Sequence, residues 1–202
     1  MLDIHHKGVI LSGGPYSVYE NDAPHVDARI FDIGIPVLGI CYGMQEVAWH
    51  FGKNVLAGEK REYGHAEVDL IQHQGMPVHI DRLFRGLEAP LQVFMSHGDK
   101  LSHLPNDFVH IASTSNAPFA GIAQIHKPIY GIQFHPEVSH TPQGTDILQN
   151  FAVDICGARQ HWTMENFVTK EIARIRHLVG QEGQVIGAVS GMHLSYCSSH
   201  SG

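Results

Sequence analysis

The stretch VLGICYGMQ (37–45) is an apolar run that stops at Cys41, with a glycine two residues away on either side. A nucleophile on a sharp turn between a strand and a helix adopts a strained backbone conformation. Its neighbours must be small, because the chain segments approach closely there. The spacing of Gly39, Cys41 and Gly43 is that of a nucleophile elbow, with cysteine in place of serine. The stretch therefore predicts a reactive thiol at the end of a buried strand.

The position of Cys41 also favours chemistry at its sulfur. A cysteine at the start of a helix lies at the positive end of the helix dipole, which favours the thiolate over the thiol. The backbone N–H of Tyr42 would then point at the oxyanion that forms when the thiolate attacks a carbonyl carbon. A buried structural cysteine between small residues would give the same pattern, so this stretch alone does not distinguish a nucleophile from a structural cysteine.

A second stretch, GIQFHPE (131–137), ends another apolar run with a histidine and, two residues later, a carboxylate. A thiolate needs a base that takes and returns its proton, and the imidazole needs a partner that fixes its tautomer. His135 and Glu137 fit these two roles. Both stretches lie at predicted strand ends, where α/β sheets place their sites. Together they predict a site built from Cys41, His135 and Glu137.

The N-terminal part of the chain predicts alternating strands and helices. GVILS (8–12) and PVLGI (36–40) have the unbroken apolar character of strands covered on both faces. APHVDARIFDI (23–33) and the run from Met44 to Phe51 have helical spacing of apolar residues. Strand, helix, strand and helix in this order predict a mostly parallel sheet with crossover helices.

The middle of the chain has shorter and more alternating runs, separated by turn residues. They predict antiparallel hairpins, which would form a small second sheet. The expected strands are 65–72, 91–96, 109–114, 119–125 and 129–134. Helices are expected from about 143 to 156 and from 162 to 179, and a new strand over 184–191.

Composition limits the classes of function. The 202 residues are 43% hydrophobic and 16% charged, which is typical of a soluble globular protein. The net charge of −7 and the lack of a basic run argue against nucleic-acid binding. We see no signal peptide or membrane-spanning run and only three cysteines, so we expect a cytosolic protein without disulfides. The seventeen histidines show no metal-ligand spacing, so no metal site is expected.

The two stretches belong to five ordered blocks that resemble class I glutamine amidotransferases. The resemblance covers about residues 7 to 190, and it implies the fold of that family. The blocks are LSGGP (11–15), GICYGMQ (39–45), REYGHAEV (61–68), MSHGDK (95–100) and GIQFHPEVSHTPQG (131–144).

The resemblance implies a role for each matching residue. Cys41 matches the nucleophile, His135 the base and Glu137 the residue that orients it. The implied reaction releases ammonia from the side chain of L-glutamine and hydrolyses a γ-glutamyl thioester, without a cofactor. The remaining matches are the oxyanion donors and the glutamine contacts: Gly14 and Tyr42, then Gln45, Ser96, Gly98 and Asp99. The last three are expected in a strand-end loop that holds the amino-acid end of glutamine, although such a loop could also be a plain turn.

The blocks REYG and MSHGDK are more narrowly similar to the glutaminase half of the GMP synthase family. There the ammonia passes to xanthosine monophosphate activated by ATP, so ATP and Mg²⁺ would serve a synthetase domain. That domain could lie in the same or another chain, and a homodimer is possible. No membrane or nucleic-acid partner is implied.

Both ends depart from the family pattern. The family begins with a strand and a helix before LSGGP, and this chain has neither, so the sheet is expected to lack its first strand. The family also has a glycine-rich ATP-binding loop, of which this chain matches only VSG (189–191), so no ATP site is expected. The expected organisation is an N-terminally truncated amidotransferase domain over 1–158, a linker helix over 159–183 and the aborted start of an ATP-pyrophosphatase domain over 184–202.

Two other functions stay open on the sequence. Another class I amidotransferase, or a γ-glutamyl hydrolase, would use the same three residues on a different substrate. A chain truncated at both ends could also be an inactive remnant that only binds a partner. Comparing free glutamine with a γ-glutamyl peptide as substrate separates the enzymatic alternatives.

Overall fold

The computed structural model describes residues 6–160, 163–180 and 183. The chain divides into two compact units, 1–159 and 160–202, and each is described by itself. The strand expected over 184–191 lies outside the described residues.

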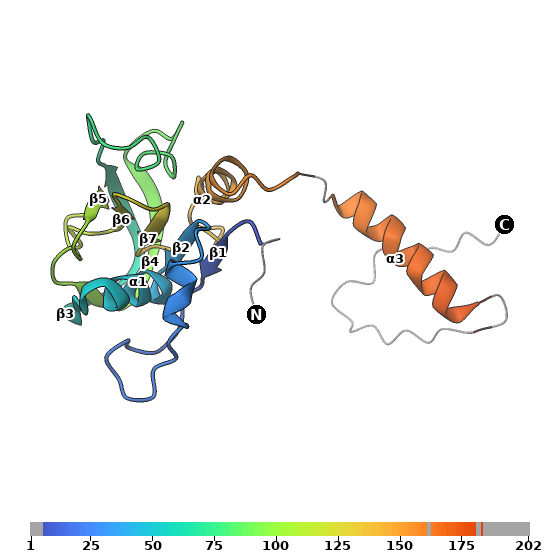
Figure 1. The fold of residues 1–202 in the computed structure, drawn as a ribbon, viewed down its shortest axis with the longest axis horizontal. Coiled ribbons are helices and arrows are strands. Elements are labelled where there is room, and N and C mark those ends of the chain that lie inside the picture. The colour runs from blue at the N-terminus through green and yellow to red at the C-terminus, as the bar shows by residue number, and fades with distance from the viewer. Residues whose placement is uncertain (1–5, 161–162, 181–182, 184–202) are drawn as a thin grey trace. The chain divides into compact units, whose positions relative to one another are not determined.

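The first unit contains a mixed sheet with helices (Figure 1). The strands follow one another in the order β1-β2-β7-β6-β5-β3-β4. In the described part of the chain the elements are β1 (Val9–Leu11), η1 (Ala28–Phe31), β2 (Val37–Ile40), α1 (Tyr42–Gly52), β3 (Val55–Leu70), β4 (Leu91–Leu101), β5 (Phe108–Ser113), β6 (Gly121–Gln124), β7 (Ile129–Ile132), α2 (Gly144–Gln149), η2 (Asn150–Ile155) and α3 (Met164–Val179).

The expected α/β architecture is present, and its sheet is more antiparallel than the sequence indicated. β1 pairs in parallel with β2, and β2 with β7. The pairs β7–β6, β6–β5, β5–β3 and β3–β4 are all antiparallel. Because β7 pairs with β2 on one side and with β6 on the other, the hairpins continue the parallel strands and form one sheet with them.

The strands that lead to the two site stretches are buried on both faces, as their unbroken apolar runs predict. Every residue of β2 and β7 is buried. Successive residues point to opposite faces of a strand. Accordingly Val37 and Ile129 belong to one apolar cluster, which includes α1, and Leu38 and Tyr130 to the other. The site is thus attached to strands that are buried along their whole length.

β3 and β4 form a long hairpin that extends beyond the expected strands. β4 continues to Leu101, so Ser96, Gly98 and Asp99 lie within a strand. The expected strand-end loop at this position was therefore wrong. Tyr63 of β3 pairs with Ser96 and keeps the ladder going through residues that alternation alone did not assign to a strand.

The expected helix over 23–33 is also wrong, because only the single 3-10 turn η1 forms there. Asp27 caps this turn by accepting a hydrogen bond from the Arg29 N–H. Gly34 has a φ of 80°, which ends any helical path. Val26 and Ile30 still pack against the core cluster around α1, so their apolar spacing reflects burial of an irregular segment.

The two helical segments near the C-terminus differ in regularity. The helix expected from about 143 to 156 is present as α2 followed by the π-helical segment η2. In the second unit, α3 agrees with the helix expected over 162–179. No helix among the described residues has the length and apolar character needed to cross a bilayer.

Close backbone contacts explain both glycines of the elbow. A Cβ built on Gly43 would lie 2.0 Å from the carbonyl oxygen of Leu11, and one on Gly39 would lie 2.3 Å from the carbonyl oxygen of Gly43. These atoms are backbone atoms of β1 and α1, so they cannot move aside as a flexible side chain can. Glycine at both positions lets α1 start directly against the sheet.

We expect Gly43→Ala to lower the free energy of unfolding by about 1–3 kcal/mol, the usual cost of overpacking. Gly14→Ala is the matched control, because its Cβ would meet Tyr42 at 3.5 Å, an ordinary contact. Urea unfolding followed by circular dichroism measures both variants. Equal stabilities for the two variants would contradict the steric role of Gly43.

Candidate active site

Cys41 lies between β2 and α1 in the conformation expected of an elbow nucleophile. Its φ of 53° and ψ of −107° are unusual for a residue with a side chain. The Cys41 N–H donates a 2.8 Å hydrogen bond to the carbonyl of Ile132 at the end of β7. The backbone of β7 therefore helps to hold the cysteine in this strained conformation.

His135 and Glu137 follow β7 and are joined to each other. His135 Nδ1 lies 2.7 Å from a Glu137 carboxylate oxygen. The carboxylate accepts, so Nδ1 carries the proton and Nε2 is the nitrogen that faces the chemistry. A Cβ built on Gly13 would lie 3.1 Å from Cε1 of His135 and 3.6 Å from Cβ of Cys41. The imidazole and the cysteine thus flank the same glycine.

The surroundings of His135 favour its protonated form. Interaction with the Cys41 side chain raises its pKa most, burial opposes this effect, and Glu137 raises the pKa further, to about 9. Cationic imidazole next to a sulfur is the arrangement that activates a cysteine as a nucleophile.

The thiol of Cys41 is directed toward β4. Its Sγ lies 3.5 Å from the carbonyl oxygen of Ser96, to which it donates. Nε2 of His135 is buried and has no hydrogen-bond partner. The thiol is thus hydrogen-bonded to the neighbouring strand and not to Nε2, and catalytic hydrogen bonds are often loose before substrate binds.

A cavity of about 530 Å³ opens at Cys41, and six of the nine residues suggested by the sequence line it. Those six are Cys41, Gly14, Gln45, Ser96, Gly98 and Asp99. Tyr42 does not line the cavity; its hydroxyl donates to the carbonyl of Pro24. As the first residue of α1, however, Tyr42 has a backbone N–H without an intrahelical acceptor.

Three side chains converge on Asp99, and two of them were not identified from the sequence. Gln45 donates to the Asp99 carbonyl at 3.3 Å, and His97 Nδ1 lies 2.9 Å from the same oxygen. The hydroxyl of Tyr19 donates to the Asp99 carboxylate at 2.9 Å. His97 falls within the quoted block MSHGDK, but nothing in that block indicates where its ring points.

Thr141 is a further residue that the sequence did not single out. Its buried hydroxyl donates to the His135 carbonyl at 2.6 Å and accepts from the Phe94 N–H at 3.1 Å. The His135 N–H in turn donates to the Phe94 carbonyl. The loop that carries the imidazole is therefore fastened to β4.

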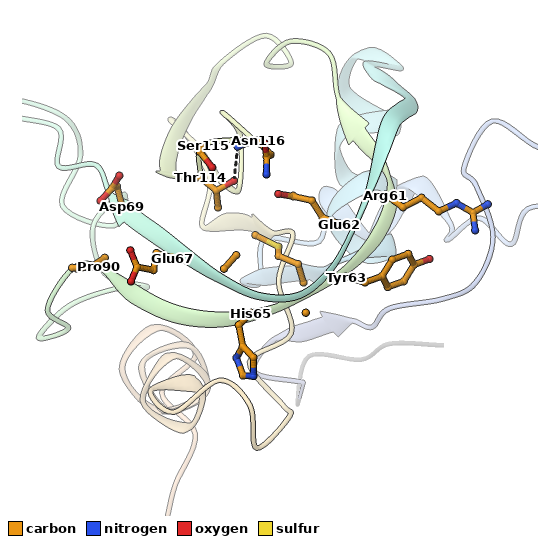
Figure 2. Close-up of a pocket in the computed structure, with 13 residues that line it drawn as sticks. Arg61, Glu62, Tyr63, His65, Glu67, Asp69, Pro90, Thr114, Ser115 and Asn116 are labelled. Carbon is orange, nitrogen blue, oxygen red and sulfur yellow. Dashed lines mark hydrogen bonds between the residues drawn. The ribbon is translucent and has the colours of Figure 1, made fainter.

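A second cavity of about 600 Å³ lies beside the first (Figure 2). Arg61 and Tyr63 line both cavities, whereas the acidic residues Glu62, Glu67 and Asp69 line only the second. Cys41 does not line this larger cavity. Among the described residues no group of three or more histidine, cysteine, aspartate or glutamate side chains is arranged to hold a metal ion.

We expect the imidazole of His135 to titrate near pH 9, measured by NMR of the ring Cε1–H and assigned with His135→Asn. The pKa of His135 in the folded chain is higher than the ordinary value of 6.5, so protonation of His135 stabilises the fold. This stabilisation is complete below about pH 6.5 and is lost as the pH rises through about 9. Cys41→Ala should move the midpoint down toward 6.5, whereas Cys156→Ala should leave it in place. A midpoint near 6.5 in the unmodified chain would contradict the pairing.

Residues 2–155 match the family model of class I glutamine amidotransferases. The chain is similar to two fungal proteins named GMP synthase [glutamine-hydrolyzing]. It is 64% identical over 187 residues to that of Phaeosphaeria nodorum and 59% identical over 185 residues to that of Saccharomyces cerevisiae. Each match covers 92% of this chain, which spans only about a third, 34%, of each relative.

Solved structures agree with this family. A Thermoplasma acidophilum protein described provisionally as part of a GMP synthase has a TM-score of 0.63 and 31% identity, over 85% of this chain and 78% of that one. A Thermotoga maritima glutamine amidotransferase shares the fold, with a TM-score of 0.54 and 23% identity over 86% of this chain and 73% of that one. From these matches and the elbow geometry, the chain belongs to the class I glutamine amidotransferase family.

Proposed function

We propose that this chain hydrolyses the side-chain amide of L-glutamine through a thioester on Cys41, with His135 as acid and base and Glu137 as the group that orients the imidazole. The observation that carries the proposal is the geometry around the elbow. Cys41 has a strained positive φ, and the imidazole beside it is hydrogen-bonded to a carboxylate through Nδ1. Family membership supports glutamine as the amide substrate.

The cavity at Cys41 offers contacts for both ends of glutamine. We propose that its side-chain amide reaches the sulfur and that its amino-acid end lies against β4, along Ser96, Gly98 and Asp99. A carboxylate such as that of Asp99 can pair with the α-ammonium group of an amino acid. We propose Gln45 as a further contact for this end of glutamine. Its side chain is held next to Asp99, because its amide donates a hydrogen bond to the Asp99 carbonyl.

In the first half of the reaction, Nε2 of His135 takes the proton of the Cys41 thiol, and the resulting thiolate attacks the amide carbon, so that a carbon–sulfur bond forms. The amide oxygen becomes an oxyanion, and the backbone N–H groups of Tyr42 and Gly14 are the proposed donors to it. When the carbon–nitrogen bond breaks, Nε2 of the His135 imidazolium gives its proton to the leaving nitrogen, which departs as ammonia. The high pKa of His135 keeps that proton available at neutral pH.

In the second half, the neutral Nε2 takes a proton from water, and the resulting hydroxide attacks the thioester carbon. The carbon–sulfur bond breaks, glutamate leaves, and the thiolate and the imidazolium are restored. Glu137 stabilises the imidazolium in both halves without itself being protonated. No cofactor enters either step of the proposal.

We further propose that the released ammonia serves the amination of xanthosine monophosphate to GMP. The similarity to fungal proteins named GMP synthase supports this proposal. The consumer would be a synthetase domain of the same or another chain, which would use ATP and Mg²⁺. A homodimer and a cytosolic location would fit this assignment. The relatives are about three times as long as this chain. We therefore propose the amination for the chain together with a synthetase domain, and not for the chain alone.

We expect a glutamine analogue that carries an electrophilic ketone to label Cys41 selectively, and L-glutamine to protect it more than a γ-glutamyl peptide does. Burial raises the pKa of the Cys156 thiol to about 11, so that residue should react slowly. Peptide mapping by mass spectrometry locates the label. Equal labelling of Cys41 and Cys156 in the folded chain would refute the proposed nucleophile, and preferential protection by the peptide would favour a γ-glutamyl hydrolase.

The two partners of the thiol should differ in importance. We expect His135→Ala to reduce glutamine hydrolysis by about 10²–10⁴-fold, the usual contribution of a general acid–base. Glu137→Ala should cost less, because it removes orientation and leaves the proton carrier. His126→Ala is the control, since that side chain is 67% exposed. Release of glutamate measures all three, and near-normal turnover by His135→Ala would contradict its role.

A further inference from the structure

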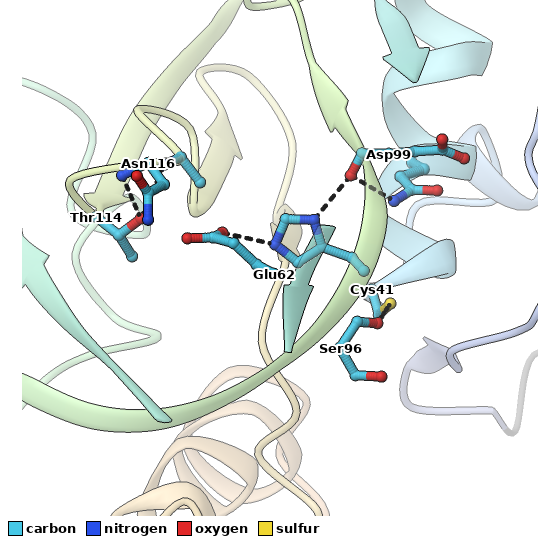
Figure 3. A network of polar contacts seen from close by, with 9 residues as sticks. Cys41, Glu62, Ser96, Asp99, Thr114 and Asn116 are labelled. Atoms are coloured by element: carbon cyan, nitrogen blue, oxygen red, sulfur yellow. Dashed lines mark hydrogen bonds and ion pairs between the residues drawn. The ribbon is translucent and has the colours of Figure 1, made fainter. Parts of the chain in front are cut away.

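His97 and Glu62 form a buried hydrogen-bonded pair beside the Cys41 cavity. Nε2 of His97 lies 3.0 Å from a Glu62 carboxylate oxygen, and their side chains are only 5% and 14% exposed. His97 lines the cavity at Cys41 and Glu62 lines the second cavity, so the pair connects the linings of the two cavities. In Figure 3 a dashed line marks the contact of the Glu62 carboxylate with the imidazole. The hydrolytic mechanism makes no use of either side chain.

Both ring nitrogens of His97 are engaged, which fixes the ring. The carbonyl oxygen of Asp99 can only accept, so the hydrogen of that 2.9 Å contact lies on Nδ1. A second hydrogen is shared between Nε2 and the Glu62 carboxylate. Leaving a buried donor or acceptor without a partner is costly, so a fully paired ring has little freedom to turn.

The pairing of β3 with β4 is irregular between His97 and Asp99. Ala57 pairs with Asp99, and the next pair along the ladder is Glu62 with His97. Between these two pairs β3 has four residues, 58–61, whereas β4 has only Gly98, and a bulge of this kind disrupts regular backbone hydrogen bonds. At this point the carbonyl of Asp99 is held by side chains, those of His97 and Gln45.

We propose that the Glu62–His97 pair is a positioning device for glutamine recognition, which holds the carbonyl of Asp99 in place at the edge of the bulge. The inference rests on the proposed function, because it assigns the amino-acid end of glutamine to this strand. His97 acts through Asp99, whose carboxylate is oriented separately by Tyr19. The pair therefore governs affinity for the amino-acid end and leaves the reactivity of the sulfur unchanged.

The test compares two alkylating agents on the full chain. The first is the glutamine analogue with an electrophilic ketone, which carries the amino-acid end, and the second is iodoacetamide, which lacks it. Glu62→Ala should raise the half-saturating concentration of the analogue on the order of tenfold, the effect of weakening one hydrogen bond to a charged group. Its limiting rate, and the rate of Cys41 alkylation by iodoacetamide, should stay unchanged.

Conservative variants separate positioning from a general structural role. In Glu62→Gln, the side-chain amide can donate to Nε2 of a neutral imidazole, so Nδ1 keeps its hydrogen for the Asp99 carbonyl. The affinity of this variant for the analogue should therefore lie within about threefold of that of the unmodified chain. His97→Asn keeps a donor near the Nδ1 position and should be milder than His97→Leu. Thermal melts of each variant report whether it folds, and Glu62→Ala, at the more exposed partner, remains informative if His97→Leu does not fold.

Each outcome is decisive. Weaker binding of the analogue with unchanged iodoacetamide labelling, restored in Glu62→Gln, supports the proposal. Unchanged binding of the analogue in Glu62→Ala overturns it while leaving the proposed function intact. Equal losses toward both reagents mean that the pair only supports the fold, which also overturns it. Failure of the analogue to label Cys41 in the unmodified chain refutes the proposed function itself, and with it this inference.

Discussion

The contact between the backbone of Gly43 and the carbonyl of Leu11 is the constraint on which the site depends. It lets α1 start against β1 with no space for a side chain between them. Cys41, immediately before the helix, is then forced into a positive φ with its sulfur beside His135 and β4. A helix displaced by the width of one methyl group would move the sulfur away from both neighbours. The strain at the cysteine is thus maintained by packing elsewhere, as is usual at functional sites.

Much of this arrangement could be predicted from the sequence, because the decisive features are local. Unbroken apolar runs marked β2 and β7, and the glycine spacing marked the elbow between β2 and α1. The predictions of secondary structure failed where apolar side chains are buried by a segment that is not a regular helix or strand. The apolar spacing of 23–33 is satisfied by an irregular segment that packs on the core, and a single 3-10 turn is its only helical part. No spacing rule distinguishes these two ways of burying the same side chains.

The residues around the cavity were harder to predict for a different reason. Pairing of Glu62 with His97 depends on the register of β3 against β4, and that register shifts at a bulge between Ala57 and Glu62. A shift of one residue would turn every side chain to the other face of the sheet. Sequence patterns fix which residues form strands far better than they fix which residues face each other. Side-chain contacts between distant segments, such as Tyr19 with Asp99, therefore required the structure.

The hydroxyl of Thr141 has a consequence for the size of substrate that the cavity accepts. It fastens the His135 loop to Phe94, a residue of the same strand that carries Asp99. The proposed base is therefore fastened to the same strand that carries the proposed contacts for the amino-acid end of glutamine. Movement of β4 as a unit shifts both together and leaves their separation unchanged. If glutamine binds as proposed, a side chain shorter by one methylene, as in asparagine, would not reach from these contacts to the sulfur.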